Sequence, residues 1–349
     1  MQVARYMVQR ASDVRALAHS ILRSQQTMAD NETHTMTLGQ STTAVDLVAE
    51  YLMICAVLTP LSCGAMAAVT ISHFRRLYLH PTFDTWKLKF NKVYPTVPAV
   101  TNEIYALSKA TLATVLLLAL SAQLGRHGYN SLFDLTKATA AQNAVNFIIC
   151  FWAVDFYSYA YHFVGHKIPE AWAIHRFHHK FWNPTPFGVI ADDCIDQVVR
   201  AMPLLFLPLL IDTLNAAVLA SVFALDLYYG VLLHSGHENK IARKVANFFE
   251  GLTGTDLINT PLNHFLHHAI SGGSTPKYCG FYVTVWDKLF GSEDKENLRK
   301  FLNGLETRTE EEFAKMNLPD YGVLGSLGYW VQAIPPLIRE DAGLAKKAA

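Results

Sequence analysis

The sequence has little charge and no paired cysteines. Lys, Arg, Asp and Glu together make up 17% of its 349 residues, below the roughly 25% of a typical soluble domain. Its 29 basic and 29 acidic residues cancel, which argues against a nucleic-acid partner, because phosphate binding needs a basic surface. The five cysteines are scattered without a CxxC pair, so neither a disulfide framework nor a cysteine-rich zinc site is expected. The chain also lacks a dinucleotide-binding glycine fingerprint and a haem-binding HPGG segment, so any electrons must come from another protein.

Apolar residues, 51% of the chain, are gathered in long runs that predict membrane spans. Residues 51–71 carry no charge, which is long enough to cross about 30 Å of hydrocarbon. Two further runs cover residues 110–124 and 141–161. Residues 201–233 are interrupted by Pro203, Pro208 and Asp212, which predicts two short helices folded back as a hairpin with Asp212 near the turn. The charged residues 291–319 predict a solvated surface helix.

Basic residues between the first two spans predict the orientation of the chain. Residues 73–103 contain five arginines and lysines, so this loop is expected to be cytosolic. The third span then ends on the cytosolic side at His162, and the hairpin leaves and returns on that side. The N-terminus would be lumenal, and glycosylation of the sequon at Asn31 would test this. Residues 1–43 favour an amphipathic or disordered arm over a mitochondrial presequence, although arginine outnumbers acid there.

Ten of the 15 histidines lie in four clusters within residues 162–268. The first cluster is HxxxH, the second and fourth are HxxHH, and the third is HSGH. Side chains at i and i+4 share one helix face, whereas adjacent ones point about 100° apart, as a site with two metals requires. The predicted metal ligands are His162, His166, His175, His178, His179, His234, His237, His264, His267 and His268.

The ten imidazoles limit which metals the site is expected to hold. Neutral imidazoles suit iron, copper, nickel or zinc rather than magnesium or calcium. A lone HxxxH or HSGH is common by chance, but two HxxHH motifs flanking an apolar hairpin are not. Structural zinc sites are four-coordinate and usually sulfur-rich, and ten histidines exceed that need. Asp155, two helical turns before His162, is either a hydrogen-bond partner of a ligand or a buried helix contact; Asp193, Asp196, Glu238 and Asn263 are weaker candidates to support the ligands.

The four clusters, in this order, resemble the fatty acid hydroxylase and sterol desaturase superfamily over about residues 155–292. The Pro-Thr-Pro-Phe segment at 184–187 and the Asp196-Gln197 pair look most like sterol C-5 desaturases. The segment WDKLFGS at 286–292 is similar to a WDxxFGT closure in several branches. The chain departs from the family at residues 277–280, Lys-Tyr-Cys-Gly, where members often have Asn-Tyr-Gly, and in the close spacing of His237 to His234.

The resemblance implies an all-α integral membrane protein, a helical transmembrane bundle with a cytosolic helical cap that holds a dimetal histidine site. It implies two iron ions, O2 as co-substrate, a lipid or sterol substrate, and cytochrome b5 with its reductase as electron donors. The expected reaction is oxidation of a lipid C–H bond, and the first candidate for the enzyme is a sterol desaturase. The alternatives are a hydroxylase of sterol, sphingolipid or fatty-acyl substrates and, from another class, a non-catalytic metal- or lipid-binding membrane protein.

The resemblance also implies a division of the chain. We expect an N-terminal arm at 1–43, transmembrane helices with a basic loop at 44–143, a fatty acid hydroxylase-like catalytic domain at 144–292 and a cytosolic tail at 293–349. The lysines at 346 and 347 look like a dilysine retrieval signal. The expected location is therefore the endoplasmic reticulum membrane, with the catalytic face cytosolic.

Overall fold

The computed structural model describes residues 43–270, 275–305 and 309–316. The chain divides into two units, residues 1–48 and 49–349. In the first unit, Thr43 and Asp46 exchange hydrogen bonds at the start of a helix, with Thr43 N 2.9 Å from Asp46 Oδ2. The site lies wholly in the second unit. The predicted N-terminal arm, its sequon and the C-terminal dilysine signal lie outside the described residues.

Four helices among the described residues are long, and the first three of them contain the predicted spans and extend beyond them. They are α2 (Ala44–Phe74), which continues as the π-helix η1 (Arg75–Leu79), α4 (Val97–Arg126), α5 (Ala140–Lys167) and α9 (Ala216–Leu233). All four are long and apolar enough to cross a membrane. Three of them begin at a polar cap, because Thr96, Thr139 and Asn215 each accept a hydrogen bond from a backbone N–H in the first turn.

The apolar segment 201–233 forms the expected pair of helices, but only the first is short, and the second is long enough to cross a membrane. Its first arm is α8 (Pro203–Leu210) and its second is α9. Asp212 lies in the turn between them, and its carboxylate is 2.6 Å from Lys137 Nζ. This ion pair is solvent-exposed, so it contributes little to stability.

Short helices make up the rest of the described structure. The predicted single charged helix at 291–319 is instead two helices, α13 and α14, since the Thr309 cap begins a new helix. No strand occurs among the described residues, which confirms the all-α class. The short helices are α3 (Phe83–Lys87), α6 (Pro169–His175), η2 (His178–Lys180), η3 (Pro186–Ile190), α7 (Cys194–Arg200), α10 (Lys240–Thr253), α11 (Pro261–Ile270), α12 (Val285–Phe290), α13 (Lys295–Leu305) and α14 (Glu310–Ala314).

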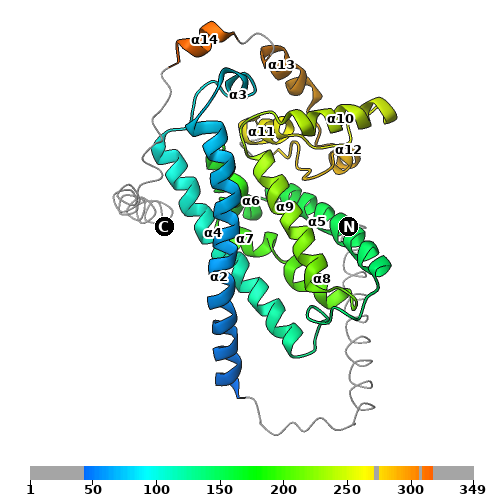
Figure 1. The fold of residues 1–349 in the computed structure, drawn as a ribbon. Helices are drawn as coiled ribbons and strands as arrows, with labels where there is room; N and C mark the ends of the chain where they lie inside the picture. The colour runs from blue at the N-terminus through cyan, green and yellow to red at the C-terminus, as the bar shows by residue number, and fades with distance from the viewer. Residues whose placement is uncertain (1–42, 271–274, 306–308, 317–349) are drawn as a thin grey trace. The chain divides into compact units, whose positions relative to one another are not determined.

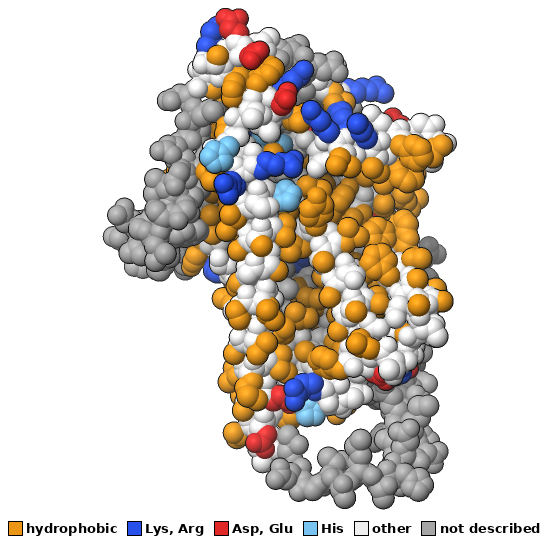
Figure 2. All heavy atoms as spheres, viewed as in Figure 1, with side chains coloured by type: hydrophobic (Ala, Val, Ile, Leu, Met, Phe, Trp, Pro, Cys, Tyr) orange, Lys and Arg blue, Asp and Glu red, His pale blue; other side chains and the backbone are white. Residues whose placement is uncertain are grey.

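The surface of the long helices is apolar. Hydrophobic side chains cover the long helices in the space-filling view, whereas charged side chains gather toward the ends of those helices (Figure 2). Many large apolar side chains on α2, α4 and α5 are exposed, among them Leu52 at 59%, Leu116 at 49% and Ile148 at 56%. A soluble protein seldom exposes such a continuous apolar surface. The chain is therefore a multi-pass membrane protein.

The helices meet around one region at the ends of α5 and α9. α5 packs against α6 and α9, and α11 packs against α9 (Figure 1). α4 packs against η3, α7 and α8, which brings the loop after α6 toward the membrane helices. The end of α5, the turn after α6, the end of α9 and the whole of α11 are the segments that carry the histidine clusters.

Candidate metal centre

Nine of the ten predicted ligands gather into two groups. Within each group, one ring nitrogen per residue lies within 4.8 Å of the others. All nine side chains are buried except that of His162, which is partly exposed. The first group is His162, His166, His175, His179 and His267, and the second is His178, His234, His264 and His268.

Each HxxHH motif supplies both groups. In the motif on α11, His264 and His268 belong to the second group and His267 to the first. Its adjacent rings, those of His267 and His268, are nearly perpendicular, at 88°. The other motif divides in the same way, with the rings of its adjacent histidines at 89°. That motif does not lie on one α-helix as expected, because α6 ends at its first histidine and the 3-10 turn η2 carries the last two.

In the second group the ring nitrogens converge on one point. The Nε2 atoms of His178 and His234 are 3.3 Å apart, those of His234 and His264 are 2.8 Å apart, and those of His264 and His268 are 3.2 Å apart. The Nδ1 atom of His234 donates to the carbonyl of Gly230 at 2.8 Å. A proton on Nδ1 leaves Nε2 with a lone pair directed at its neighbours, which is unfavourable unless a cation lies between them.

The spacing of these nitrogens fits a metal ion. Two nitrogens that bind one metal at about 2.1 Å lie about 3.0–3.4 Å apart for bond angles near 90–110°. The contacts in the second group are close to this range. The residues present therefore fit a metal at this position.

The first group has the same organisation. The Nδ1 atoms of His162 and His267 donate to the carbonyls of Cys279 at 3.1 Å and Lys277 at 2.5 Å. The Nε2 atoms of His267 and His179 are 3.1 Å apart. The Nε2 atom of His162 is buried without a hydrogen-bond partner among the described residues. Converging imidazole nitrogens, of which that of His162 is buried without a partner among the described residues, fit a second metal.

Burial lowers the pKa of six of these histidines. It is the largest cause that lowers the pKa of His178, His179, His264, His267 and His268 well below the usual value, followed for each by neighbouring imidazoles. Burial also lowers the pKa of His234 to about 4. Neutral imidazoles at physiological pH have the lone pairs that metal binding requires.

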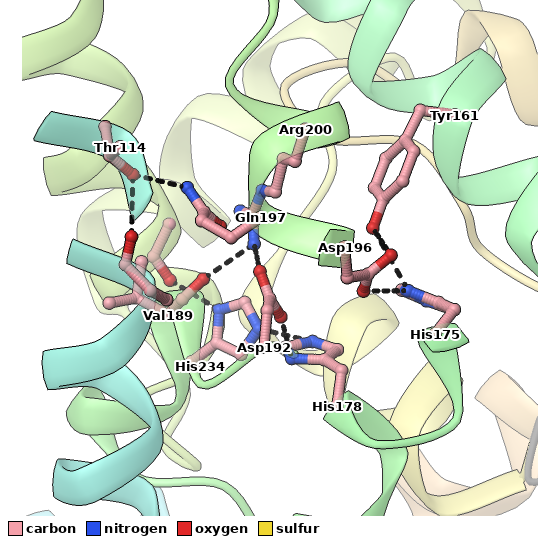
Figure 3. Close-up of polar contacts among 12 residues, drawn as sticks. Thr114, Tyr161, His175, His178, Val189, Asp192, Asp196, Gln197, Arg200 and His234 are labelled. Atoms are coloured by element: carbon pink, nitrogen blue, oxygen red, sulfur yellow. Dashed lines mark hydrogen bonds and ion pairs between the residues drawn. The ribbon is translucent and has the colours of Figure 1, made fainter. Parts of the chain in front are cut away.

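A buried carboxylate orients a histidine of the second group. Asp192 Oδ1 lies 2.8 Å from His178 Nδ1, and Asp192 Oδ2 lies 3.0 Å from Arg200 Nη1 (Figure 3). The sequence reasoning missed Asp192 and named its neighbour Asp193, whose carboxylate instead accepts from Ile195 N at 2.9 Å as the cap of α7. No local signal distinguishes the two adjacent aspartates.

A second carboxylate, that of the candidate Asp196, contacts a histidine of the first group. Asp196 Oδ2 lies 3.0 Å from His175 Nδ1, and Asp196 also accepts from the hydroxyl of Tyr161 (Figure 3). Carboxylate–histidine pairs of this kind fix the tautomer and orientation of a metal ligand.

The other candidates for this role have other partners. Asp155 accepts from Tyr282 N at 2.8 Å and from Trp286 Nε1 at 2.7 Å, so it is a buried helix contact. Glu238 forms an ion pair with Arg243 at 3.1 Å. The recorded polar contacts of Asn263 are with Thr260 and Asp256.

His237 belongs to neither group. Its Nδ1 lies 2.9 Å from the carbonyl of Ser235, and its ring packs edge-on against Tyr78 at 5.0 Å. Gly236 adopts a φ of 67°, so the HSGH segment turns sharply after His234. His237 lines a separate cavity of about 610 Å³.

The segment that departs from the family supports the site through its backbone. The contacts to His162 and His267 come from the carbonyls of Cys279 and Lys277, which any residue can supply. Asp287 fixes this loop, since it accepts from Cys279 N at 2.8 Å, from Gly280 N at 2.9 Å and from the Ser292 hydroxyl at 2.5 Å. The departure in side chains therefore leaves these contacts in place.

Comparison with known proteins places these residues in a family. Residues 147–292 match the family model of the fatty acid hydroxylases, and this stretch contains all ten clustered histidines. It is a fatty acid hydroxylase domain. The expected superfamily is thus confirmed.

Relatives of this domain include sterol desaturases. The chain is similar to the Delta(7)-sterol 5(6)-desaturase of Leptosphaeria maculans, with 27% identity over 188 residues, which are 53% of this chain and 47% of the relative. A Delta(7)-sterol 5(6)-desaturase of Gibberella zeae is 26% identical over 196 residues, 55% of this chain and 51% of the relative. These matches support the sterol desaturase branch at modest identity.

A third relative is a monooxygenase. The human alkylglycerol monooxygenase is 28% identical over 160 residues, 44% of this chain and 32% of the relative. The chain therefore spans about half the length of the two desaturases and about a third of the monooxygenase. No solved structure matches the chain.

Proposed function

We propose that this chain oxidises a C–H bond of a membrane lipid at a two-iron centre held by the nine gathered histidines. The observation that carries the proposal is the division of both HxxHH motifs between two groups of converging ring nitrogens. The names of the relatives, desaturases and a monooxygenase, support an oxidoreductase. Iron, when bound, would supply with O2 and external electrons the oxidising chemistry that side chains lack.

The chain's own residues would hold and shield this chemistry. Asp192 and Asp196 fix the orientation of His178 and His175. A cavity of about 30 Å³ lies among the histidines and Arg200, large enough for about one or two molecules of the size of water. Its small volume and buried walls exclude bulk solvent from the reacting position.

We infer that sterol desaturation is the reaction, because two of the relatives are sterol desaturases. The alternative is hydroxylation of a lipid by a monooxygenase reaction, which the similarity to alkylglycerol monooxygenase supports. A non-catalytic metal- or lipid-binding protein is the alternative from another class. We further propose cytochrome b5 and its reductase as electron donors, and an endoplasmic reticulum location with the histidines on the cytosolic side.

Expression in a yeast strain that lacks its own sterol C-5 desaturase tests the reaction. Mass spectrometry of extracted sterols should show a restored 5,6 double bond, and the His178→Ala variant should not restore it. An unchanged sterol profile, together with cleavage of a supplied alkylglycerol, would move the assignment to the monooxygenase. If the protein is shown to contain two irons and has neither activity, the oxidation proposal is contradicted.

Glycosylation tests the orientation. The sequon at Asn31 should be glycosylated in microsomes if the N-terminus is lumenal. If instead a sequon inserted in the 73–103 loop were glycosylated, the histidines would lie on the lumenal side.

A further inference from the structure

A second, larger cavity lies beside the histidine centre. It has a volume of about 430 Å³ and lies between α2, α4, α7, α8 and α9. This is within the range of about 300–1,000 Å³ for small-molecule sites. Most of its walls are apolar and come from membrane-spanning helices, including Leu58, Leu61, Leu118, Leu204, Phe223 and Leu227.

One side chain connects this cavity to the histidines. Arg200 lines both the 430 Å³ cavity and the 30 Å³ cavity among the histidines. Its Nη1 donates to the Val189 carbonyl and to Asp192, each at 3.0 Å (Figure 3). The part of the apolar cavity that adjoins Arg200 is thus the part nearest to the metal centre.

The same part of the cavity contains an unpaired acceptor. Gln197 lies one helical turn before Arg200 on α7, lines the cavity and is only 4% exposed. Its Nε2 donates to Thr114 Oγ1 at 2.8 Å (Figure 3). Its Oε1 is buried and has no hydrogen-bond partner among the described residues.

Thr114 determines which way the amide of Gln197 points. The hydroxyl hydrogen of Thr114 is already donated to the carbonyl of Ala110 at 3.0 Å. The hydroxyl oxygen can therefore only accept, so it must face the NH₂ group of Gln197. The amide oxygen is consequently held as an acceptor in a mostly apolar cavity, whose wall also carries Arg200 and Asp226, and this position is unfavourable unless a ligand donates to it.

We propose that this cavity binds a lipid alcohol whose hydroxyl group donates to Gln197 Oε1. The apolar body of the lipid fills the walls from α2, α4 and α9. The carbon that is oxidised then lies close to the carbon that bears the hydroxyl, because Gln197 is one helical turn from Arg200, which lines both this cavity and the one among the histidines. This inference rests on the proposed function in one respect, that the cavity holds the substrate. Sterols and alkylglycerols share the required hydroxyl.

Binding measurements on the purified full chain in lipid nanodiscs test the inference without turnover. The probes are radiolabelled cholesterol, its 3-methyl ether, which cannot donate, and 1-O-hexadecylglycerol. The wild-type protein should bind at least one of the two alcohols. Gln197→Leu should weaken that binding about 3- to 10-fold, the usual value of one hydrogen bond, and leave binding of the methyl ether unchanged. The alcohol whose binding is weakened by Gln197→Leu identifies which of the two kinds of lipid the cavity binds.

Two threonines on α4 supply a matched pair that leaves Gln197 intact. Thr114 and Thr111 both line the cavity, and each hydroxyl donates to the carbonyl four residues earlier. Only Thr114 holds the amide of Gln197. Thr114→Val should therefore weaken alcohol binding at least about twofold, whereas Thr111→Val should not, which keeps the test valid if the Gln197 variant fails to fold.

The outcomes separate this inference from the proposed function. Equal binding of alcohol and ether, with no effect of Gln197→Leu or Thr114→Val on either, overturns the inference even if lipid oxidation is observed. A selective loss of alcohol binding in both variants supports it, even if no oxidation of the bound lipid is found. Selective alcohol binding without oxidation, in protein that contains iron, would contradict the proposed function and leave this inference standing.

Discussion

The carboxylate of Asp192 joins His178 to Arg200. One oxygen lies 2.8 Å from the Nδ1 atom of the histidine, and the other lies 3.0 Å from the guanidinium. This short contact positions the imidazole of His178, whose Nε2 atom lies 3.3 Å from that of His234. Asp192 is therefore expected to hold His178 in place for metal binding.

Replacing Asp192 should weaken the second metal site. In Asp192→Asn the amide offers one acceptor to two donors, so either His178 or Arg200 loses its partner. We expect about 10- to 100-fold lower metal affinity at that site, measured by competition with a chelator and by metal analysis. Asp193→Asn is the control, because Asn also caps helices and residue 193 contacts α7 rather than a histidine. Equal metal retention in the two variants would contradict the role of Asp192.

The two aspartates also show where sequence reasoning stops. The spans and the histidine clusters could be predicted because apolar runs and i, i+4 spacing are local patterns. Which of two adjacent aspartates turns toward a histidine depends on how the chain enters α7 and on the position of α6. Both are tertiary properties that one sequence does not encode locally.

Backbone groups and turns account for the remaining differences. The carbonyls of Lys277 and Cys279 accept hydrogen bonds from two of the gathered histidines, and a carbonyl leaves no signal in the residue type. The positive φ of Gly236 turns the chain sharply after His234, and His237 belongs to neither histidine group although it was predicted as a metal ligand. The long-range position of Gln197 beside Thr114 was equally inaccessible, since 83 positions separate them.

Three histidine variants should give different metal contents. His178→Ala should deplete the second group and His267→Ala the first, since each removes one ligand from one group. His237→Ala should retain both metals, because His237 lines a different cavity. Elemental analysis of purified protein, normalised to protein concentration, measures this. Loss of a metal in the His237 variant would restore the ten-ligand site that the sequence predicts.

Asp287 should matter for stability and for the first metal group. Asp287→Ala removes the acceptor for two backbone N–H groups and the Ser292 hydroxyl. We expect a loss of about 2–4 kcal/mol in the free energy of unfolding and a lower metal content. Thermal unfolding in detergent and elemental analysis test this.

Lys277→Ala is the comparison for Asp287→Ala, since it changes a side chain of the same loop and keeps the carbonyl that faces His267. It should retain both metals. A Lys277 variant as damaging as the Asp287 variant would show that side chains rather than the backbone of this loop support the histidines.

Acid should destabilise the metal-free protein. An unfolded histidine has a pKa of about 6.5, whereas burial lowers the pKa of folded His234 to about 4. Between these values the unfolded chain binds more protons than the folded one, so stability is complete above about pH 6.5 and falls as the pH approaches 4. The Tm of chelator-treated protein should therefore fall progressively as the pH drops below about 6.5 toward 4. The Tm of metal-loaded protein should remain high to a lower pH, because the metal competes with protons for Nε2. Parallel Tm profiles with and without metal would show that these nitrogens do not bind it.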